Sequence, residues 1–105
     1  MILDITEFKN KKVIVTGSST GIGFETGIEF LELGANVIFH GNRSIEDLDN
    51  RIKKRTANHN FSILKSDFTI LSEVENFMKY ATKELGGLNI LINNAGTMVG
   101  RYFLD

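Results

Sequence analysis

The stretch Val13-Ile-Val-Thr-Gly-Ser-Ser-Thr-Gly-Ile-Gly23 decides the fold. A β-branched run turns at Gly17, and two further glycines, Gly21 and Gly23, follow before a helical pattern begins. Glycine at the end of a strand allows a sharp turn, because it has no Cβ to block positive φ. Backbone N–H groups at the turn and at the start of the helix can then bind an anion such as a pyrophosphate. Strand, glycine turn and helix together predict the entrance to a nucleotide-binding βαβ unit.

We call residues 16–23 the glycine motif. Its hydroxyl side chains, Ser18, Ser19 and Thr20, are expected to add hydrogen-bond donors to the rim of the anion site. The spacing Gly-x-x-x-Gly-x-Gly differs from the Gly-x-Gly-x-x-Gly of the common dinucleotide fingerprint. Such a glycine cluster is also compatible with an ordinary loop, but the strand before it and the helix after it favour a binding site.

Length, composition and charge restrict the class of protein. The 105 residues suffice for one small domain, and the content of 42% hydrophobic and 24% charged residues is ordinary for a soluble globular protein. A net charge of -1 argues against nucleic acid as a partner, and the absence of cysteine excludes disulfides, a thiol nucleophile and zinc-finger spacing. No apolar run approaches the roughly 20 residues of a membrane helix. The acidic residues close behind Met1 do not fit a signal peptide, so we expect a cytoplasmic protein without membrane contact.

Strands and helices alternate along the chain. The predicted strands cover residues 13–16, 36–40, 61–66 and 88–92, and the predicted helices cover residues 21–33, 44–55 and 72–85. Such alternation predicts a parallel sheet, and right-handed crossovers predict the strand order 3-2-1-4. The expected fold is therefore α/β, a Rossmann-like doubly wound parallel sheet truncated after its fourth strand. We expect the first two helices on one face of the sheet and the third on the other, with the cofactor crevice at the carboxyl ends of strands one and four.

The helices carry periodic apolar residues and end signals. The residues that repeat on one face of each predicted helix are Ile22, Thr26, Phe30 and Leu33; then Ile45, Leu48 and Ile52; and last Val74, Phe77, Met78, Ala81 and Leu85. Ser44-x-x-Asp47 and Ser72-x-x-Glu75 are predicted capping boxes for the second and third helices. Gly27, inside the first helix, marks either a close helix–sheet contact or a surface position. The charged residues of the second helix are interpreted as a solvated face.

Three segments together carry a resemblance to a known family. They are residues 16–23, Asp67 after the third strand, and Asn93-Asn94-Ala95-Gly96 after the fourth, in that order along the chain. In this combination the chain resembles the short-chain dehydrogenase/reductase family over essentially its whole length. Within that family it looks most similar to 3-oxoacyl-acyl carrier protein reductases or sugar dehydrogenases.

The resemblance implies roles for particular residues. Residues 17–23, Ile22 included, would hold the pyrophosphate of a dinucleotide cofactor. Asp67 would accept a hydrogen bond from the adenine amino group, with the backbone of Phe68 beside it. The segment Asn94-Ala95-Gly96 would line the cofactor near its ribose. Taken singly, Asp67 could instead be a turn residue before a helix, and Asn93-Asn94 a turn that ends a strand.

The choice of dinucleotide can be argued from charge. NAD-binding domains usually place an acidic residue about 20 residues past the glycine turn, where it binds the ribose hydroxyls. Residues 35–43 contain no acid, and Arg43 stands there with Ser44 beside it. A guanidinium can pair with a 2′-phosphate, so we expect NADP rather than NAD, unless Arg43 is an ordinary surface residue. His40 is interpreted as structural and receives no role in the site.

The resemblance also shows what this chain lacks. Members of the family transfer hydride between a nicotinamide and a carbonyl or alcohol carbon, using a serine and a Tyr-x-x-x-Lys pair beyond the fourth strand. Tyr80 is followed four residues later by Glu84, and only three residues follow Tyr102, so we assign no catalytic residue and expect no activity from the chain alone.

Residues 1–105 are thus expected to be the incomplete, amino-terminal cofactor-binding part of such an oxidoreductase. The alternatives are a stand-alone NADP-binding module and a half-enzyme completed by another chain. The fourth strand would be an open edge, which predicts self-association or a completing chain along it.

Overall fold

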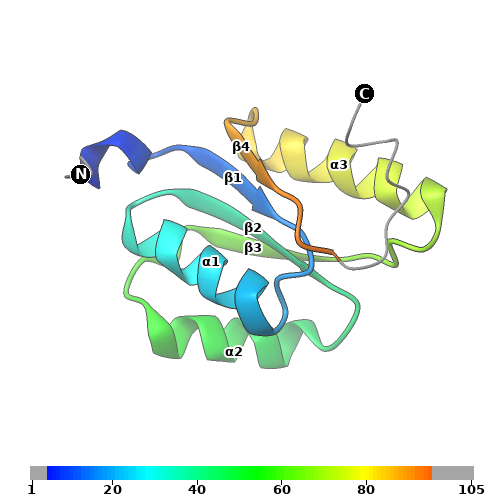
Figure 1. The fold of residues 1–105 in the computed structure, drawn as a ribbon, viewed down its shortest axis with the longest axis horizontal. Helices are drawn as coiled ribbons and strands as arrows, with labels where there is room; N and C mark the ends of the chain where they lie inside the picture. Colours follow the sequence, from blue (N-terminus) through cyan, green and yellow to red (C-terminus); the bar gives the residue numbers. More distant parts are fainter. Residues whose placement is uncertain (1–4, 96–105) are drawn as a thin grey trace.

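The structure of this protein is a computed structural model that describes residues 5–95 (Figure 1). Its elements in chain order are the 3₁₀ helix η1 (Ile5–Phe8), β1 (Lys12–Val15), α1 (Gly21–Glu32), β2 (Asn36–Gly41), α2 (Ile45–Arg55), β3 (Phe61–Lys65), α3 (Leu71–Leu85) and β4 (Ile90–Ile92). The predicted alternation of strands and helices is therefore confirmed, with boundaries that differ by one or two residues at most ends.

The four strands form one sheet in the order β3-β2-β1-β4, and every neighbouring pair is parallel. The predicted order 3-2-1-4 is confirmed, and the fold is a truncated Rossmann-like α/β fold. β1 lies in the middle, with Val13 opposite both Val37 of β2 and Ile90 of β4. The carboxyl ends of β1, β2 and β4 consequently meet at one edge of the sheet, where the glycine motif begins.

The sheet separates two hydrophobic clusters. The first contains Phe24, Ile28 and Leu31 of α1 and Leu48 and Ile52 of α2, packed on one face of β1 and β2. The second contains Val74, Phe77 and Ala81 of α3 on the opposite face, with Met78 and Leu85 packed against it. The predicted distribution of helices is confirmed, and Figure 1 shows α1 and α2 together on the side away from α3.

The apolar face predicted for α1 is not its buried face. Its buried residues are Gly23, Phe24, Gly27, Ile28 and Leu31, whereas Ile22 is 78% exposed. The glycines explain the error, because a face that contains them does not look apolar in a sequence pattern. A Cβ on Gly27 would overlap the ring of Phe39 in β2, so this glycine is a close helix–sheet contact, not a surface position.

The two predicted capping boxes have different outcomes. Ser44 caps α2 as expected, since its hydroxyl oxygen accepts the Asp47 N–H at 3.2 Å. The box at Ser72 is wrong, because α3 already begins at Leu71 after the N-cap Ile70, which makes no side-chain cap bond. A turn in which the Ile70 N–H donates to the Asp67 carbonyl, at 3.2 Å, starts the helix one residue early.

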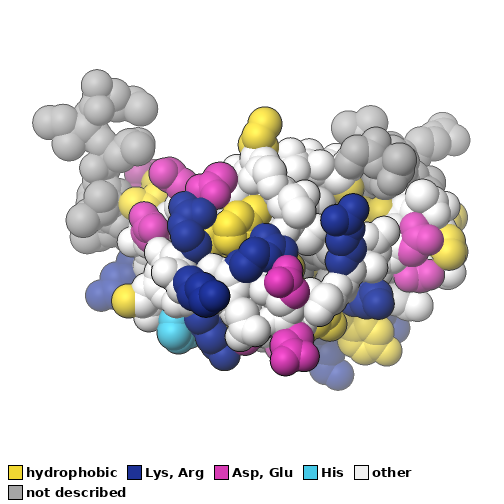
Figure 2. Space-filling view, turned by 90° about the horizontal axis from the view of Figure 1, so that it is seen from below, with side chains coloured by type: hydrophobic (Ala, Val, Ile, Leu, Met, Phe, Trp, Pro, Cys, Tyr) yellow, Lys and Arg dark blue, Asp and Glu magenta, His cyan; other side chains and the backbone are white. Residues whose placement is uncertain are grey.

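The outer face of α2 carries charges of both signs. Figure 2, seen from the α2 side, shows Lys and Arg side chains interspersed with Asp and Glu. Lys53 pairs with Asp49 at 2.9 Å, and Arg55 pairs with Glu25 of α1 at 2.8 Å. These exposed pairs confirm a solvated face, and pairs of this kind contribute little to stability.

Two negative findings apply to residues 5–95. No helix in that range is both long enough and apolar enough to cross a bilayer. The same residues contain no cluster of three His, Asp or Glu side chains arranged to hold a metal ion.

Candidate dinucleotide site

The glycine motif begins at a crowded point between β1 and the segment after β4. Gly17 has φ +60°, and a Cβ there would lie 2.9 Å from the Ala95 Cα. Positive φ and close backbone contact both require glycine. The sequence prediction of a sharp turn at this position is therefore confirmed, and its neighbour in space is the predicted ribose-binding segment.

Thr16 joins the ends of β1 and β4. Its buried hydroxyl oxygen accepts the N–H groups of Asn94, at 3.0 Å, and Ala95, at 3.1 Å. The Asn94 side-chain amide in turn donates to the Gly17 carbonyl at 3.1 Å. The structure thus brings Asn94 and Ala95 against the glycine motif. Gly96, the third residue assigned to the ribose, lies outside the described residues.

The other two glycines serve different purposes. A Cβ on Gly23 would overlap the Gly17 carbonyl oxygen and the Asn94 side chain, so Gly23 permits the first turn of α1 to fold back on the motif. Gly21 has φ +63°, but a Cβ on it would meet no atom within 4 Å, so it faces open space. A compact turn whose outer side is unobstructed fits the close approach of a pyrophosphate to backbone N–H groups.

The three hydroxyl residues do not act together. Ser18 is fully buried, and its hydroxyl donates to the Val15 carbonyl at 2.7 Å, so the expectation that it adds a donor to the rim is wrong. Its N–H is also used, since it donates to the His40 carbonyl at 2.8 Å. Ser19 and Thr20 do line a pocket at the surface.

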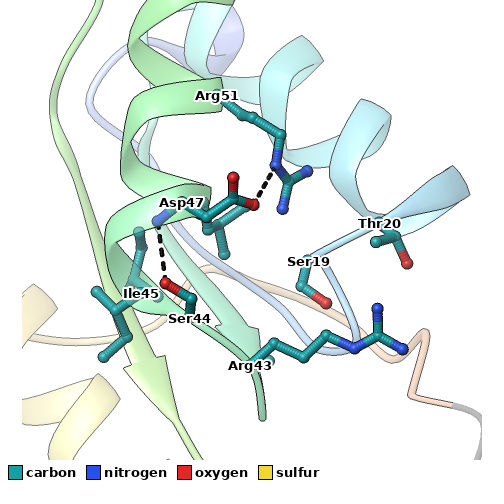
Figure 3. A pocket seen from close by; sticks show the side chains of 10 residues that line it. Ser19, Thr20, Arg43, Ser44, Ile45, Asp47 and Arg51 are labelled. Carbon is teal, nitrogen blue, oxygen red and sulfur yellow. Dashed lines mark hydrogen bonds and ion pairs between the residues drawn. The ribbon is translucent and has the colours of Figure 1, made fainter.

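That pocket has a volume of about 300 Å³ and lies between the glycine motif, the end of β2 and the start of α2. Its wall includes Arg43 and Ser44, the residues assigned to the cofactor's ribose end. Figure 3 shows the Arg43 side chain extended toward Ser19 and Thr20. Within residues 5–95, Arg43 forms no ion pair, whereas several other cations of the domain do. The pocket therefore presents a guanidinium that no described acid compensates.

A second arginine lines the same pocket and was not assigned to it from the sequence. Arg51 reaches the pocket from α2, its Nε donates to Asp47 at 2.9 Å, and its guanidinium lies 5.1 Å from the centre of the Phe24 ring. Asp47 is an acid in the pocket, but Arg51 pairs with it. The spacing Ser44, Asp47, Leu48, Arg51 places all four on one side of a helix and could have revealed this.

Asp67 and Phe68 follow β3 at the same edge of the sheet but do not line this pocket. The Asp67 carboxylate accepts the Thr69 N–H at 2.9 Å and the Thr69 hydroxyl at 2.7 Å, and these bonds lower the pKa of Asp67. Both bonds end on Oδ1, which leaves Oδ2 to accept a hydrogen bond from an adenine amino group. The interpretation of Asp67 as a turn residue and its interpretation as an adenine ligand are therefore compatible. Phe68 is buried.

His40 is a residue of this site that sequence reasoning set aside. It is the last residue but one of β2, and its ring lies between the glycine motif and the end of β3, where Nδ1 accepts the Gly17 N–H at 2.8 Å. The interpretation of His40 as structural is correct as far as packing goes, since only 5% of the residue is exposed. No feature of the sequence indicated that His40 bonds directly to the glycine motif.

The sequence assigned no catalytic role to Tyr80 or Tyr102. Tyr80 is 62% exposed on α3, on the outer surface of the domain. Tyr102 lies outside the described residues.

Comparison with known proteins bears on this site. Residues 11–105 match the family described as short chain dehydrogenase. An uncharacterized oxidoreductase of Staphylococcus saprophyticus is 38% identical over 90 residues, which cover 86% of this chain and 36% of that protein.

Two solved structures are similar in fold and sequence. A short chain dehydrogenase from Mycobacterium smegmatis has a TM-score of 0.77 and 26% identity, covering 86% of this chain and 38% of its own. An NADH-dependent reductase solved in complex with NAD has a TM-score of 0.76 and 26% identity, covering 90% of this chain and 39% of its own. The chain therefore spans about two fifths of the length of the proteins it matches.

Proposed function

This chain belongs to the short-chain dehydrogenase family, and from that premise we propose that residues 1–105 form an NADP-binding, incomplete Rossmann domain of an oxidoreductase. The family suggests a nicotinamide dinucleotide as cofactor. The observation that carries the preference for NADP is Arg43, which makes no ion pair among the described residues and lines the pocket beside Ser19 and Thr20.

Three features of the pocket favour a 2′-phosphate over a bare ribose hydroxyl. The Arg43 guanidinium can form charge-assisted hydrogen bonds with a phosphate. The amino end of α2 points at the same pocket, and its dipole favours negative charge. Among the described residues, Asp47 is the one acid that lines the pocket, and its charge is compensated by Arg51.

The remaining proposed contacts follow the order of the motifs. Backbone N–H groups of residues 19–23 bind the pyrophosphate, Asp67 receives the adenine amino group, with the Phe68 backbone beside it, and Asn94 and Ala95 border the adjoining ribose, with Gly96 proposed beside them. When bound, the nicotinamide supplies or accepts a hydride. In the proposed reaction of the whole oxidoreductase, that hydride moves to or from a carbonyl or alcohol carbon, and residues 1–105 only bind and orient the cofactor.

The test is titration of the purified chain with NADP and with NAD. We expect tighter binding of NADP, and Arg43→Ala should weaken it by about 10- to 100-fold, the range of one to two charge-assisted bonds, with little change for NAD. Arg55→Ala is the matched control, because Arg55 pairs with Glu25 and does not line the pocket. An unchanged ratio of the two affinities in Arg43→Ala would contradict the preference for NADP.

A second candidate, a half-enzyme completed by another chain, is favoured by the surface at β4. β4 is an edge strand of three half-buried residues, and a cavity of about 840 Å³ beside it is lined by the apolar side chains Phe8, Ile22, Phe30, Leu33 and Ile92. A completing strand and helix would cover both features. Oxidoreductase activity that arises only on mixing this chain with a second polypeptide would support this candidate. Self-association along β4 is a separate possibility, and a strictly monomeric chain in sedimentation would argue against it.

A further inference from the structure

The ring of His40 connects two loops that are distant in sequence. Its Nδ1 accepts the Gly17 N–H at 2.8 Å, and its Nε2 lies 3.0 Å from the Ser66 carbonyl oxygen at the end of β3. An N–H donates to Nδ1 and a carbonyl can only accept, so the ring must be neutral with its proton on Nε2. In this geometry the His40 ring is therefore the neutral tautomer with its proton on Nε2, and not the imidazolium.

The backbone of His40 holds the next residue of the glycine motif. The His40 N–H donates to the Ser18 hydroxyl oxygen at 2.7 Å, and the His40 carbonyl accepts the Ser18 N–H at 2.8 Å. Residues 17 and 18 are therefore both positioned by His40. The part of the motif that follows them carries the N–H groups proposed to bind the pyrophosphate.

The surroundings of the ring oppose a positive charge. The ring stacks on Phe68 with centroids 3.9 Å apart and meets Phe77 edge-on at 4.9 Å. Burial lowers the pKa of His40 below its ordinary 6.5, and the bond to the Ser66 carbonyl opposes this only in part. Both neighbouring rings are buried, so water has little access to the imidazole.

Among the described residues, no charged group near the ring offsets this burial. β2 and the glycine motif contain no other titratable side chain. On the segment after β3, the Asp67 carboxylate is held by Thr69, and on α3 the Glu73 carboxylate accepts the Asp67 N–H at 2.8 Å. Neither acid shifts the pKa of His40, which burial lowers and the bond to the Ser66 carbonyl raises in part.

We propose that His40 is a positioning residue of the dinucleotide site, whose neutral ring holds Gly17 so that the glycine motif is shaped to bind the cofactor. The proposal rests on the proposed dinucleotide binding. Protonation would put an N–H on Nδ1 against the Gly17 N–H, two donors facing each other at the start of the motif. Cofactor affinity should therefore fall with His40 protonation, by up to about tenfold for each pH unit below the folded pKa of His40.

Substitutions separate the two ring nitrogens. In His40→Asn an amide oxygen can take the place of Nδ1 and accept the Gly17 N–H without titrating. In His40→Gln the amide reaches the Nε2 position, and Gly17 loses its acceptor. We expect His40→Asn to retain affinity within a few-fold of wild type at neutral pH and to lose the acid-dependent fall. His40→Gln should bind about tenfold more weakly across the whole pH range.

The affinity of NADP is measured by titration from about pH 8 down through the folded pKa of His40, which NMR of the imidazole nitrogens locates. The 2′-phosphate of NADP titrates near pH 6, so the quantity compared is the ratio of wild-type to His40→Asn affinity at each pH, in which that effect cancels. His59→Gln is the matched control, because His59, the other histidine, is exposed and contacts the Thr56 carbonyl.

A second measurement does not need the cofactor. In the ligand-free chain, NMR of the imidazole nitrogens should show the proton on Nε2, and the Gly17 amide signal should shift as His40 titrates. The same Gly17 signal should not follow pH in His40→Asn. These readouts report on the hydrogen bond itself, and a purely packing role for His40 would leave them unchanged.

The outcomes are distinct. If the affinity ratio is constant with pH, or if the Gly17 signal does not follow His40, the positioning role is overturned. If His40→Gln binds NADP as well as wild type, the role is also overturned. If no variant binds NADP or NAD at any pH while Gly17 still follows His40, the proposed function fails and the His40–Gly17 link stands as a structural bond only.

Discussion

The two halves of the glycine motif differ in how they are held. Gly17 and Ser18 are bonded on every side, by His40, Val15 and Asn94, and Ser18 is fully buried. Thr20, Gly21 and Ile22 lie at the surface, and Gly21 faces open space. We call residues 17 and 18 the anchored half and residues 19–22 the open half, although a glycine and a serine occur in both.

One half of the motif fixes its shape, and the other half offers contacts to a ligand. The anchored half uses its polar groups inside the protein and fixes where the chain emerges from β1. The open half keeps its groups available for a cofactor. Substitutions should therefore affect stability in the anchored half and binding in the open half, and the following predictions test this division.

Gly23→Ala should have the largest effect. The new Cβ would overlap the Gly17 carbonyl oxygen, which belongs to the backbone and cannot rotate away. We expect a loss of about 2–3 kcal/mol in the free energy of unfolding, the upper part of the range for overpacked sites, together with loss of cofactor binding. Denaturant unfolding and NADP titration measure both. Native stability in this variant would show that α1 can move away from the motif.

Ser18→Ala should come next, with a loss of about 1–3 kcal/mol, because the buried His40 N–H would lose its acceptor. Ser19→Ala is the matched control in the open half, where a change within about 0.5 kcal/mol is expected for a surface substitution. Denaturant unfolding measures both variants. Equal losses in the free energy of unfolding for Ser18→Ala and Ser19→Ala would contradict the distinction between the two halves.

The pH dependence of stability tests the anchor at His40. Its folded pKa lies below its ordinary 6.5, so its contribution is fully present above pH 6.5 and is lost as the pH falls toward the folded value. The free energy of unfolding should decrease by no more than about 1.4 kcal/mol per pH unit in that window. Unfolding of wild type and of His40→Asn is compared at matched pH values. The decrease in the free energy of unfolding that is due to His40 should be missing from the variant.

Of the two glycine substitutions, Gly21→Ala should have the smaller effect on stability. Its φ of +63° disfavours an L-residue, at a cost of about 1–2 kcal/mol, but no neighbouring atom obstructs the new methyl group. Binding should suffer more than stability, because the methyl group would stand where the pyrophosphate is proposed to lie. A variant that keeps full NADP affinity would exclude Gly21 from the binding surface.

The sequence by itself predicted the elements, their order in the sheet and the placing of the motifs at one edge. These features depend on local patterns: apolar periodicity separates strands from helices, and parallel crossovers have one hand. Gly17 could be predicted to end a strand because its positive φ is a demand of the local backbone. Arg43 could be placed at that edge of the sheet because it lies two residues after β2, which ends there.

Only the tertiary structure decided how α1 is rotated, that Ser18 points inward and that His40 binds Gly17. Each of these depends on a contact between elements, such as the bond joining residues 17 and 40, and no local pattern records it. The glycines of α1 concealed its buried face, because their role is to bring backbone close to Phe39 and Gly17, not to contribute apolar side chains. The sequence determined where a dinucleotide could bind, and packing determined which groups remained available to bind it.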